Sequence, residues 1–299
     1  MEPERLALSE KWIILDDLPL FFRFADQAAE TGATPIIHVH GFGISGRYLV
    51  PTAELLAPQY PTYVPDLPGY GRSHKPKRTL SIPQLADAMA AFLDAVGVER
   101  AVLLGNSMGC LITVEFAHAY PDRIERAILV SPAGGPHNQP IYRGLPQLGR
   151  DSLLETPRII PIAVPDYIRF GPFSSMRLFR AMTQYPTIDR VLALDLPILV
   201  VAGARDPLVS KERLKELVEQ RPGTTLVIHN RAAHAINFSH PKALARVVRS
   251  WLADQPIEVE GAEPGEVVIL GKSAAANPPE AVDQQFEQLP ADDANQVTI

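Results

Sequence analysis

The most constraining feature of the sequence is the pentapeptide Gly-Asn-Ser-Met-Gly at 105–109. It follows an apolar run at 101–104 and precedes an apolar stretch with helical character at 110–117, so the order predicts a strand, a sharp turn and a helix. The central residue of such a turn is held in a strained backbone conformation, which requires small flanking residues. We therefore expect Ser107 to present its hydroxyl at the carboxyl edge of a sheet. The same pattern also occurs in ordinary glycine-rich turns.

A serine hydroxyl becomes a useful nucleophile only when a base takes its proton and a third group orients that base. Asp206 follows the predicted buried strand 196–203 and would project from the end of that strand. His234 lies in the loop after the next predicted strand, 224–229. Nucleophile, acid and base thus occur in the order Ser, Asp, His, and each follows a strand.

Other residues could fill the acid and base roles. The rivals nearby in the chain are Asp189, Asp195, His229 and His240. Both acids precede their strand, the first histidine lies inside a strand, and the second stands before the proline of a predicted helix start. Asp206 itself could be a turn aspartate, because it precedes Pro207. Position after a strand favours Asp206 and His234.

Backbone N–H groups are also needed where negative charge develops on an attacked carbonyl. The segment His-Gly-Phe-Gly at 40–43 follows the predicted strand 35–39, and the N–H of Phe42 could pair with that of Met108. His38 and His40 alternate on this strand, but no third ligand with metal spacing accompanies them. We therefore expect no metal, with His38 in the core and His40 orienting the loop.

With these motifs in order, the chain resembles the α/β-hydrolase superfamily. The resemblance covers about residues 12–254 and includes the segment Asp-Leu-Pro-Gly-Tyr-Gly-Arg-Ser at 66–73. Such enzymes commonly carry a loop of this kind after their fourth strand. Serine at 107 argues against the haloalkane dehalogenase and epoxide hydrolase branches, which use aspartate there.

The resemblance implies a serine hydrolase that acts on a small ester or related acyl compound without a cofactor. Ser107 would attack the carbonyl, His234 would transfer the proton, and Asp206 would orient the histidine. Phe42 and Met108 would form the oxyanion hole through their backbone N–H groups. The expected partner is a small-molecule substrate, and the sequence leaves the oligomeric state open.

Two other functions stay open at this point. The elbow, the cap and its arginines also look like the branch that hydrolyses carbon–carbon bonds in aromatic ring-cleavage products. Those enzymes typically carry tryptophan after the catalytic histidine and Gly-Pro-Gly in the oxyanion loop, whereas this chain has Ala235 and Gly-Ile-Ser-Gly at 43–46. A binding or receptor protein of the same fold is the third reading of the sequence.

Strand and helix signals alternate along the chain. They predict an α/β-hydrolase fold with an eight-stranded, mostly parallel sheet, helices on both faces and a helical cap inserted after strand 6. The predicted strands are 12–15, 20–24, 35–39, 60–64, 101–104, 127–130, 197–202 and 224–229. Helical spacing of apolar residues at 81–96, with Ser81 ahead of Pro83, predicts a helix that starts at Ser81.

The chain divides into four segments. Residues 1–132 and 191–254 are expected to form the two parts of the hydrolase core, 133–190 the cap, and 255–299 an acidic tail. From residue 254 onward the sequence has ten acids and one base, so we expect a disordered tail apart from one candidate short strand at 266–270. Without this stretch the rest of the chain holds 27 basic and 24 acidic residues. This balance lacks the excess of positive charge that is typical of nucleic-acid-binding proteins.

The proline-rich cap carries apolar and aromatic residues that could cover Ser107. The candidates for substrate binding are Tyr142, Phe170, Phe173, Met176 and Phe179. They could equally pack the cap onto the core. The cap also holds seven arginines against four acids between 140 and 190, and a solvated surface accounts for that excess.

Composition is typical of a soluble enzyme, and the lack of targeting signals leads us to expect a cytoplasmic protein. With 299 residues and 46% hydrophobic content, the chain can bury one large core. The N-terminal residues lack the pattern of a signal peptide, and no apolar stretch is long enough for a membrane span. The single cysteine, Cys110, excludes an internal disulfide and is expected to be a small buried residue.

Overall fold

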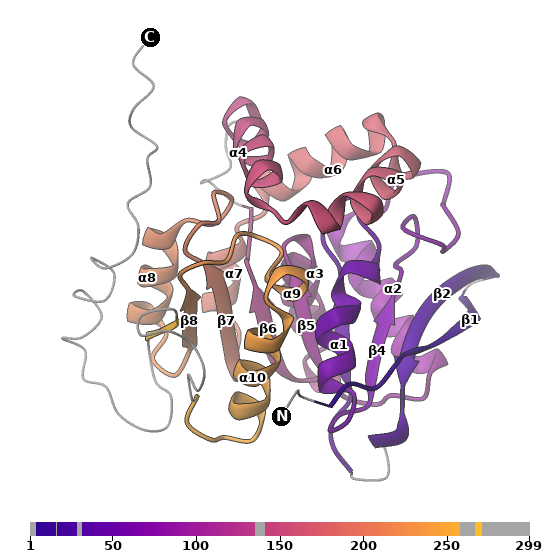
Figure 1. The fold of residues 1–299 in the computed structure, drawn as a ribbon. Helices are drawn as coiled ribbons and strands as arrows, with labels where there is room; N and C mark the ends of the chain where they lie inside the picture. Colours follow the sequence, from indigo (N-terminus) through magenta and orange to yellow (C-terminus); the bar gives the residue numbers. More distant parts are fainter. Residues whose placement is uncertain (1–3, 16, 29–31, 135–140, 258–266, 271–299) are drawn as a thin grey trace.

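A computed structural model of the chain describes residues 4–15, 17–28, 32–134, 141–257 and 267–270. In these residues a twisted sheet lies between two layers of helices, and a further group of helices covers one edge of the sheet (Figure 1). The predicted fold class is confirmed. The disorder expected for the tail falls mostly outside the described residues.

The strands form one sheet in the order β1-β2-β4-β3-β5-β6-β7-β8-β9. The nine strands within the described residues are β1 (Ser9–Leu15), β2 (Leu18–Ala25), β3 (Ile36–Val39), β4 (Thr62–Pro65), β5 (Ala101–Asn106), β6 (Ile124–Val130), β7 (Ile198–Gly203), β8 (Thr225–His229) and β9 (Val267–Leu270). Strands β3 to β8 are parallel, whereas β1, β2 and β9 are antiparallel to their neighbours. Eight of them match the predicted strands, and β9 is the candidate strand of the tail, paired with β8.

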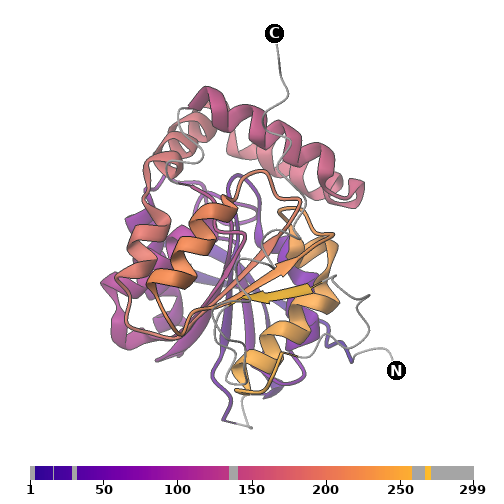
Figure 2. The ribbon, with the colours of Figure 1, turned by 90° about the vertical axis from the view of Figure 1, so that its left-hand side faces the viewer.

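The helices divide into two layers and a cap (Figures 1 and 2). Their bounds are α1 (Val50–Leu56), α2 (Ile82–Ala95), α3 (Met108–Ala119), α4 (Ile141–Leu154), α5 (Ile160–Phe170), α6 (Pro172–Gln184), α7 (Thr187–Leu192), α8 (Lys211–Gln220), α9 (Ile236–Ser239) and α10 (Pro241–Leu252). Helices α1, α9 and α10 cover one face of the sheet, and α2, α3, α7 and α8 cover the other. We call α4, α5 and α6 the cap; it lies over the carboxyl edge of the parallel strands.

Local sequence explains where the elements begin and how deeply they lie. All residues of β5 and β7 are buried, as expected for central parallel strands that are covered on both faces. Helix α2 starts at the predicted place because the side chain of Ser81 accepts a hydrogen bond from the N–H of Gln84, and the Gln84 side chain accepts one from the N–H of Ser81.

The turn between β5 and α3 has the strained geometry that the sequence indicates. Ser107 has φ of 56°, a value that residues with a side chain rarely adopt. A Cβ atom at Gly105 would lie 2.4 Å from the backbone of Gly109, and one at Gly109 would lie 2.1 Å from the carbonyl oxygen of Val39. Both glycines are therefore required by close backbone contacts, which fix where Ser107 stands.

A matched pair of glycine substitutions tests this constraint. We expect Gly109→Ala to lower the free energy of unfolding by about 1–3 kcal/mol, because the backbone of β3 must move away. At Gly149, within α4, a Cβ atom meets no other atom within 4 Å, so Gly149→Ala should leave stability unchanged or raise it by up to about 1 kcal/mol. Urea denaturation measures both, and equal effects would contradict the close contact.

Candidate active site

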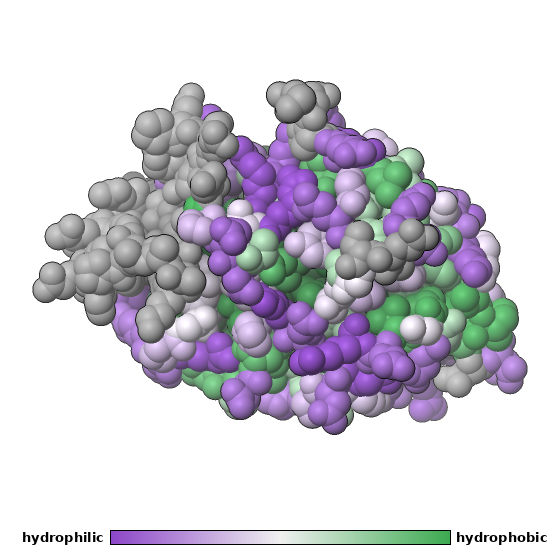
Figure 3. All heavy atoms as spheres, turned by 90° about the horizontal axis from the view of Figure 1, so that it is seen from below, coloured by the Kyte–Doolittle hydropathy of each residue, from purple (hydrophilic) through white to green (hydrophobic). Residues whose placement is uncertain are grey.

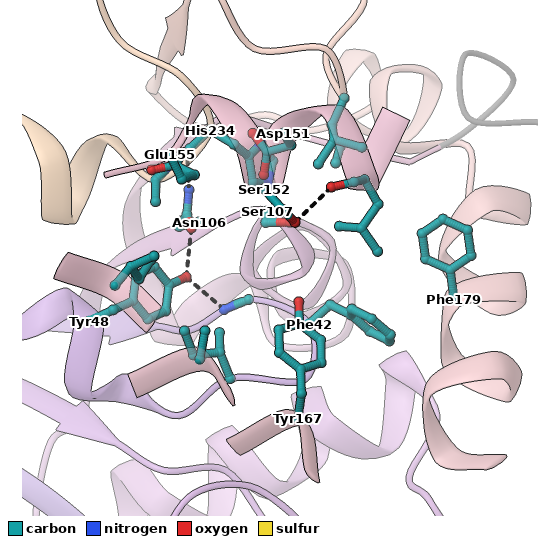
Figure 4. A pocket seen from close by; sticks show the side chains of 18 of the residues that line it. Phe42, Tyr48, Asn106, Ser107, Asp151, Ser152, Glu155, Tyr167, Phe179 and His234 are labelled. Atoms are coloured by element: carbon teal, nitrogen blue, oxygen red, sulfur yellow. Dashed lines mark hydrogen bonds between the residues drawn. The ribbon is translucent and has the colours of Figure 1, made fainter. Parts of the chain in front are cut away.

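The structure brings Ser107, Asp206 and His234 to one place at the carboxyl edge of the sheet. Ser107 stands at the elbow after β5, Asp206 in the turn after β7, and His234 in the loop after β8. The Nδ1 atom of His234 lies 2.7 Å from Oδ2 of the buried Asp206. Ser107 and His234 line the same pocket (Figure 4). The rivals Asp189 and Asp195 take no part in this arrangement, and Asp189 pairs with Arg213.

Burial and three nearby carboxylates together determine the pKa of His234. Burial of the imidazole lowers its pKa, but the negative charges of Asp206, Asp151 and Glu155 outweigh burial and raise the pKa to about 9. The other ring nitrogen, Nε2, is buried and has no hydrogen-bond partner among the described residues. His234 thus has one nitrogen fixed by Asp206 and one free to exchange a proton with a group in the pocket.

A buried network connects the loop after β3 to the elbow and to the histidine loop (Figure 4). The hydroxyl of Tyr48 accepts a hydrogen bond from the N–H of Gly41 at 2.9 Å and donates one to Oδ1 of Asn106 at 2.6 Å. The Asn106 amide then donates to the carbonyl oxygens of Val130 and His234, at 3.1 and 3.3 Å. Tyr48 and Asn106 therefore fix the positions of three loops relative to one another.

His40 also orients the loop after β3, through hydrogen bonds to Gly41 and Leu67. The N–H of Leu67 donates to Nε2 of His40 at 3.0 Å, so Nδ1 carries the proton and donates to the carbonyl of Gly41, also at 3.0 Å. Burial lowers the pKa of His40, in keeping with a neutral ring. His38 is fully buried, and burial lowers its pKa to about 3.

The two predicted oxyanion residues both lie beside Ser107. Met108 is the first residue of α3, and Phe42 lines the pocket. A Cβ atom added to Gly41 would lie 3.3 Å from Cβ of Ser107, so the loop runs against the elbow. Within the described residues, the N–H groups of Phe42 and Met108 have no hydrogen-bond acceptor. Both donors are available to a ligand.

The pocket has a volume of about 270 Å³ and is mostly apolar. Its apolar lining includes Phe42, Ile44, Leu148, Ile159, Ile160, Ala163, Val164, Tyr167, Phe179, Met182 and Leu208. Residues of the hydrolase core form its floor and residues of the cap form its roof. Polar groups are concentrated at one end, around Ser107 and His234 (Figure 4).

Two of the residues predicted to bind substrate take different places around the pocket. Phe179 lines it. Phe170 is buried behind the lining, where its ring meets that of Phe42 edge to face at 5.9 Å and stacks on Tyr70. Tyr142 belongs to α4, but its side chain lies outside the described part of the structure.

For Phe173 and Met176 the prediction is corrected. Their exposed fractions are 91% and 53%, and neither lines the pocket. Among the buried residues of α6, Met182 lies about half a helical turn around from Phe173, and Phe179 lies about a third of a turn from it. The pocket faces that buried side, so Phe173 stands on the outer side, and Met176 lies between the two sides with about half of its surface exposed.

Sequence reasoning missed two acids that line the pocket beside His234, Asp151 and Glu155 (Figure 4). Glu155 accepts a hydrogen bond at 2.6 Å from the N–H of Ala235, and one oxygen of each carboxylate is buried without a partner among the described residues. Burial raises the pKa of Glu155 and raises that of Asp151 to about 7. Their i, i+4 spacing was the available signal, but it does not indicate where the end of α4 docks.

Comparison with known proteins agrees with this fold. The alpha/beta hydrolase family matches residues 36–247. A pimeloyl-[acyl-carrier protein] methyl ester esterase of Pectobacterium carotovorum is 29% identical over 252 residues, which cover 74% of this chain and 95% of that protein. An uncharacterized protein of Mycobacterium tuberculosis is 31% identical over 279 residues, which cover 81% and 82%. A thermophilic esterase from Thermogutta terrifontis, at 22% identity, has the same fold, with a TM-score of 0.67 over 82% of this chain and 98% of that chain.

The chain therefore belongs to the alpha/beta hydrolase family. Within that family it is an esterase-like hydrolase. Among the described helices, none combines the length and the apolar character that crossing a membrane requires.

Removal of the Tyr48 hydroxyl should show how much the buried hydrogen-bond network contributes to stability. We expect Tyr48→Phe to lower the free energy of unfolding by about 1–3 kcal/mol, because the buried N–H of Gly41 loses its acceptor. Tyr60→Phe is the matched control, because no hydrogen bond to the Tyr60 hydroxyl is found among the described residues. Urea denaturation of both variants gives the comparison, and equal losses would argue against the network.

Proposed function

We propose that the protein is a serine hydrolase that cleaves a small ester or related acyl compound through an acyl-enzyme. The observation that carries this proposal is the position of His234, whose Nδ1 is held 2.7 Å from Asp206 while its Nε2 stays free in the pocket that Ser107 lines. The strained φ of Ser107 supports it, because strain of this kind is maintained at functional sites. A protein that only binds its ligand has no need of that conformation.

In the proposed reaction, Oγ of Ser107 attacks the carbonyl carbon of the ester and its proton passes to Nε2 of His234. Asp206 stabilises the imidazolium, and the N–H groups of Phe42 and Met108 stabilise the oxyanion. Collapse of the tetrahedral intermediate breaks the bond to the alcohol oxygen, which takes the proton from His234. Water then attacks the acyl group on Ser107, with His234 again as base, and the carboxylic acid leaves.

The pocket indicates the kind of acyl group. A volume of about 270 Å³ with a mostly apolar lining suits a short to medium chain rather than a polar or charged one. The Pectobacterium relative is named for a methyl ester esterase, which supports an ester with a small alcohol as substrate. The proposal does not specify the acid or the alcohol further.

A panel of p-nitrophenyl esters from acetyl to decanoyl, together with a ring-cleavage dienoate, tests the reaction type. We expect the highest kcat/KM on short to medium esters, and a loss of about 10⁴-fold or more in kcat for Ser107→Ala. In addition, a fluorophosphonate should add once to the native protein and not to Ser107→Ala, as read by intact mass. Turnover of the dienoate far above every ester would instead favour a carbon–carbon hydrolase, and binding without any turnover would favour a receptor.

The pH dependence should reflect the acids around His234. As a general base His234 must be neutral, so kcat/KM should rise with pH until the pH passes its pKa of about 9. Asp151→Asn removes one of the negative charges that hold the proton on His234, so the rise should move to lower pH. Ser152→Ala, at the adjacent position, should leave the profile in place. An unchanged profile in Asp151→Asn would show that Asp151 does not act on His234.

A further inference from the structure

Most of the exposed large hydrophobic residues of the described structure lie on the cap. Nine large hydrophobic residues are exposed in the described structure, and six of them belong to the cap helices: Leu153, Ile160, Val164, Ile168, Phe173 and Met176. Three of the six recur at every fourth position of α5 and therefore share one side of that helix. A stripe of exposed apolar residues along one side of a helix is typical of an interaction site.

The acidic residues of the cap face the hydrolase core, whereas its exposed charged residues are arginines. The cap sequence from 141 to 184 has three acids and no lysine. Asp151 and Glu155 adjoin the histidine loop, and Asp166 accepts a hydrogen bond from the N–H of Ser45 at 2.8 Å, so all three face the hydrolase core. The exposed arginines are Arg150, Arg158, Arg169, Arg177 and Arg180. Among the described residues of the cap, the exposed charge is thus entirely positive.

The apolar outer surface is continuous with the pocket. Ile160 and Val164 line the pocket, yet their exposed fractions are 54% and 50%. Both side chains therefore contact the cavity and the outer surface at once. Seen from the opposite end, the molecule shows hydrophilic and apolar areas mixed together where its atoms are not grey (Figure 3).

We propose that the outer surface of the cap docks on an anionic lipid surface, from which apolar esters enter the pocket past α5. Apolar side chains combined with arginines match the boundary between acyl chains and anionic headgroups, where no directional pairing is needed. A protein partner would have to present carboxylates at fixed positions opposite these arginines, whereas anionic headgroups move laterally and can rearrange around them. The docking does not depend on the proposed reaction, whereas the entry of esters into the pocket rests on it.

Vesicle co-sedimentation of the full chain tests the proposal. We expect binding to vesicles of phosphatidylglycerol mixed with phosphatidylcholine, weak binding to phosphatidylcholine alone, and weakening with salt. Arg177→Glu with Arg180→Glu should weaken binding by about tenfold or more, and Ile168→Ser with Phe173→Ser by a similar factor. All four positions are exposed, so these variants should keep the native fold and melting temperature. Lys11→Glu and Ile14→Ser, at exposed positions of β1, are the matched controls and should bind as the native chain does.

Several outcomes would overturn the proposal. These are failure of the full chain to bind anionic vesicles, equal binding by the cap variants and the native chain, or binding that requires removal of the acidic residues 271–299. Binding of an acidic acyl-carrier protein but not of vesicles would make a protein the partner. Self-association abolished by Phe173→Ser, without vesicle binding, would make a second copy the occupant. Measured on Ser107→Ala, vesicle binding also separates this proposal from the proposed function, because no turnover is involved.

Discussion

The start of α3 lies directly against the end of β3, with no side chain between the two backbones. This contact between Gly109 and Val39 fixes the axis of the helix and with it the strained turn at Ser107. It also determines where the chain goes after β3, since the loop that follows must pass beside Ser107 and carry Phe42 there. Ser107 and the N–H groups of Phe42 and Met108 are thus brought together by main-chain packing.

The environment of His234 is shared between the hydrolase core and the cap. The core supplies Asp206, which holds one ring nitrogen, while the end of α4 supplies two further carboxylates and binds the N–H of Ala235. Their charges outweigh the effect of burial on the pKa of His234. Docking of the cap therefore raises the pKa of His234 as well as enclosing the pocket.

The sequence was informative wherever short-range pattern or chain order determines the structure. The predicted strands agree with the observed ones because apolar runs alternate with helical spacing, and carboxyl ends of parallel strands meet at one edge, which is where Ser107, Asp206 and His234 are found. Which side of a cap helix faces the core depends on long-range packing instead. For that reason Phe173 and Met176 were misplaced, and Asp151 and the hydrogen bonds of Tyr48 were not foreseen.

Strands β6 and β7 are hydrogen-bonded neighbours although the entire cap separates them in the chain, with Ala127 opposite Ile198. The register of the sheet therefore does not depend on what the cap contains. Changes in the length or composition of α4, α5 and α6 can alter the roof of the pocket while β5, β7 and β8 keep their places. During evolution, the stretch of the gene that encodes the cap is therefore free to vary while the stretches that encode Ser107, Asp206 and His234 stay the same.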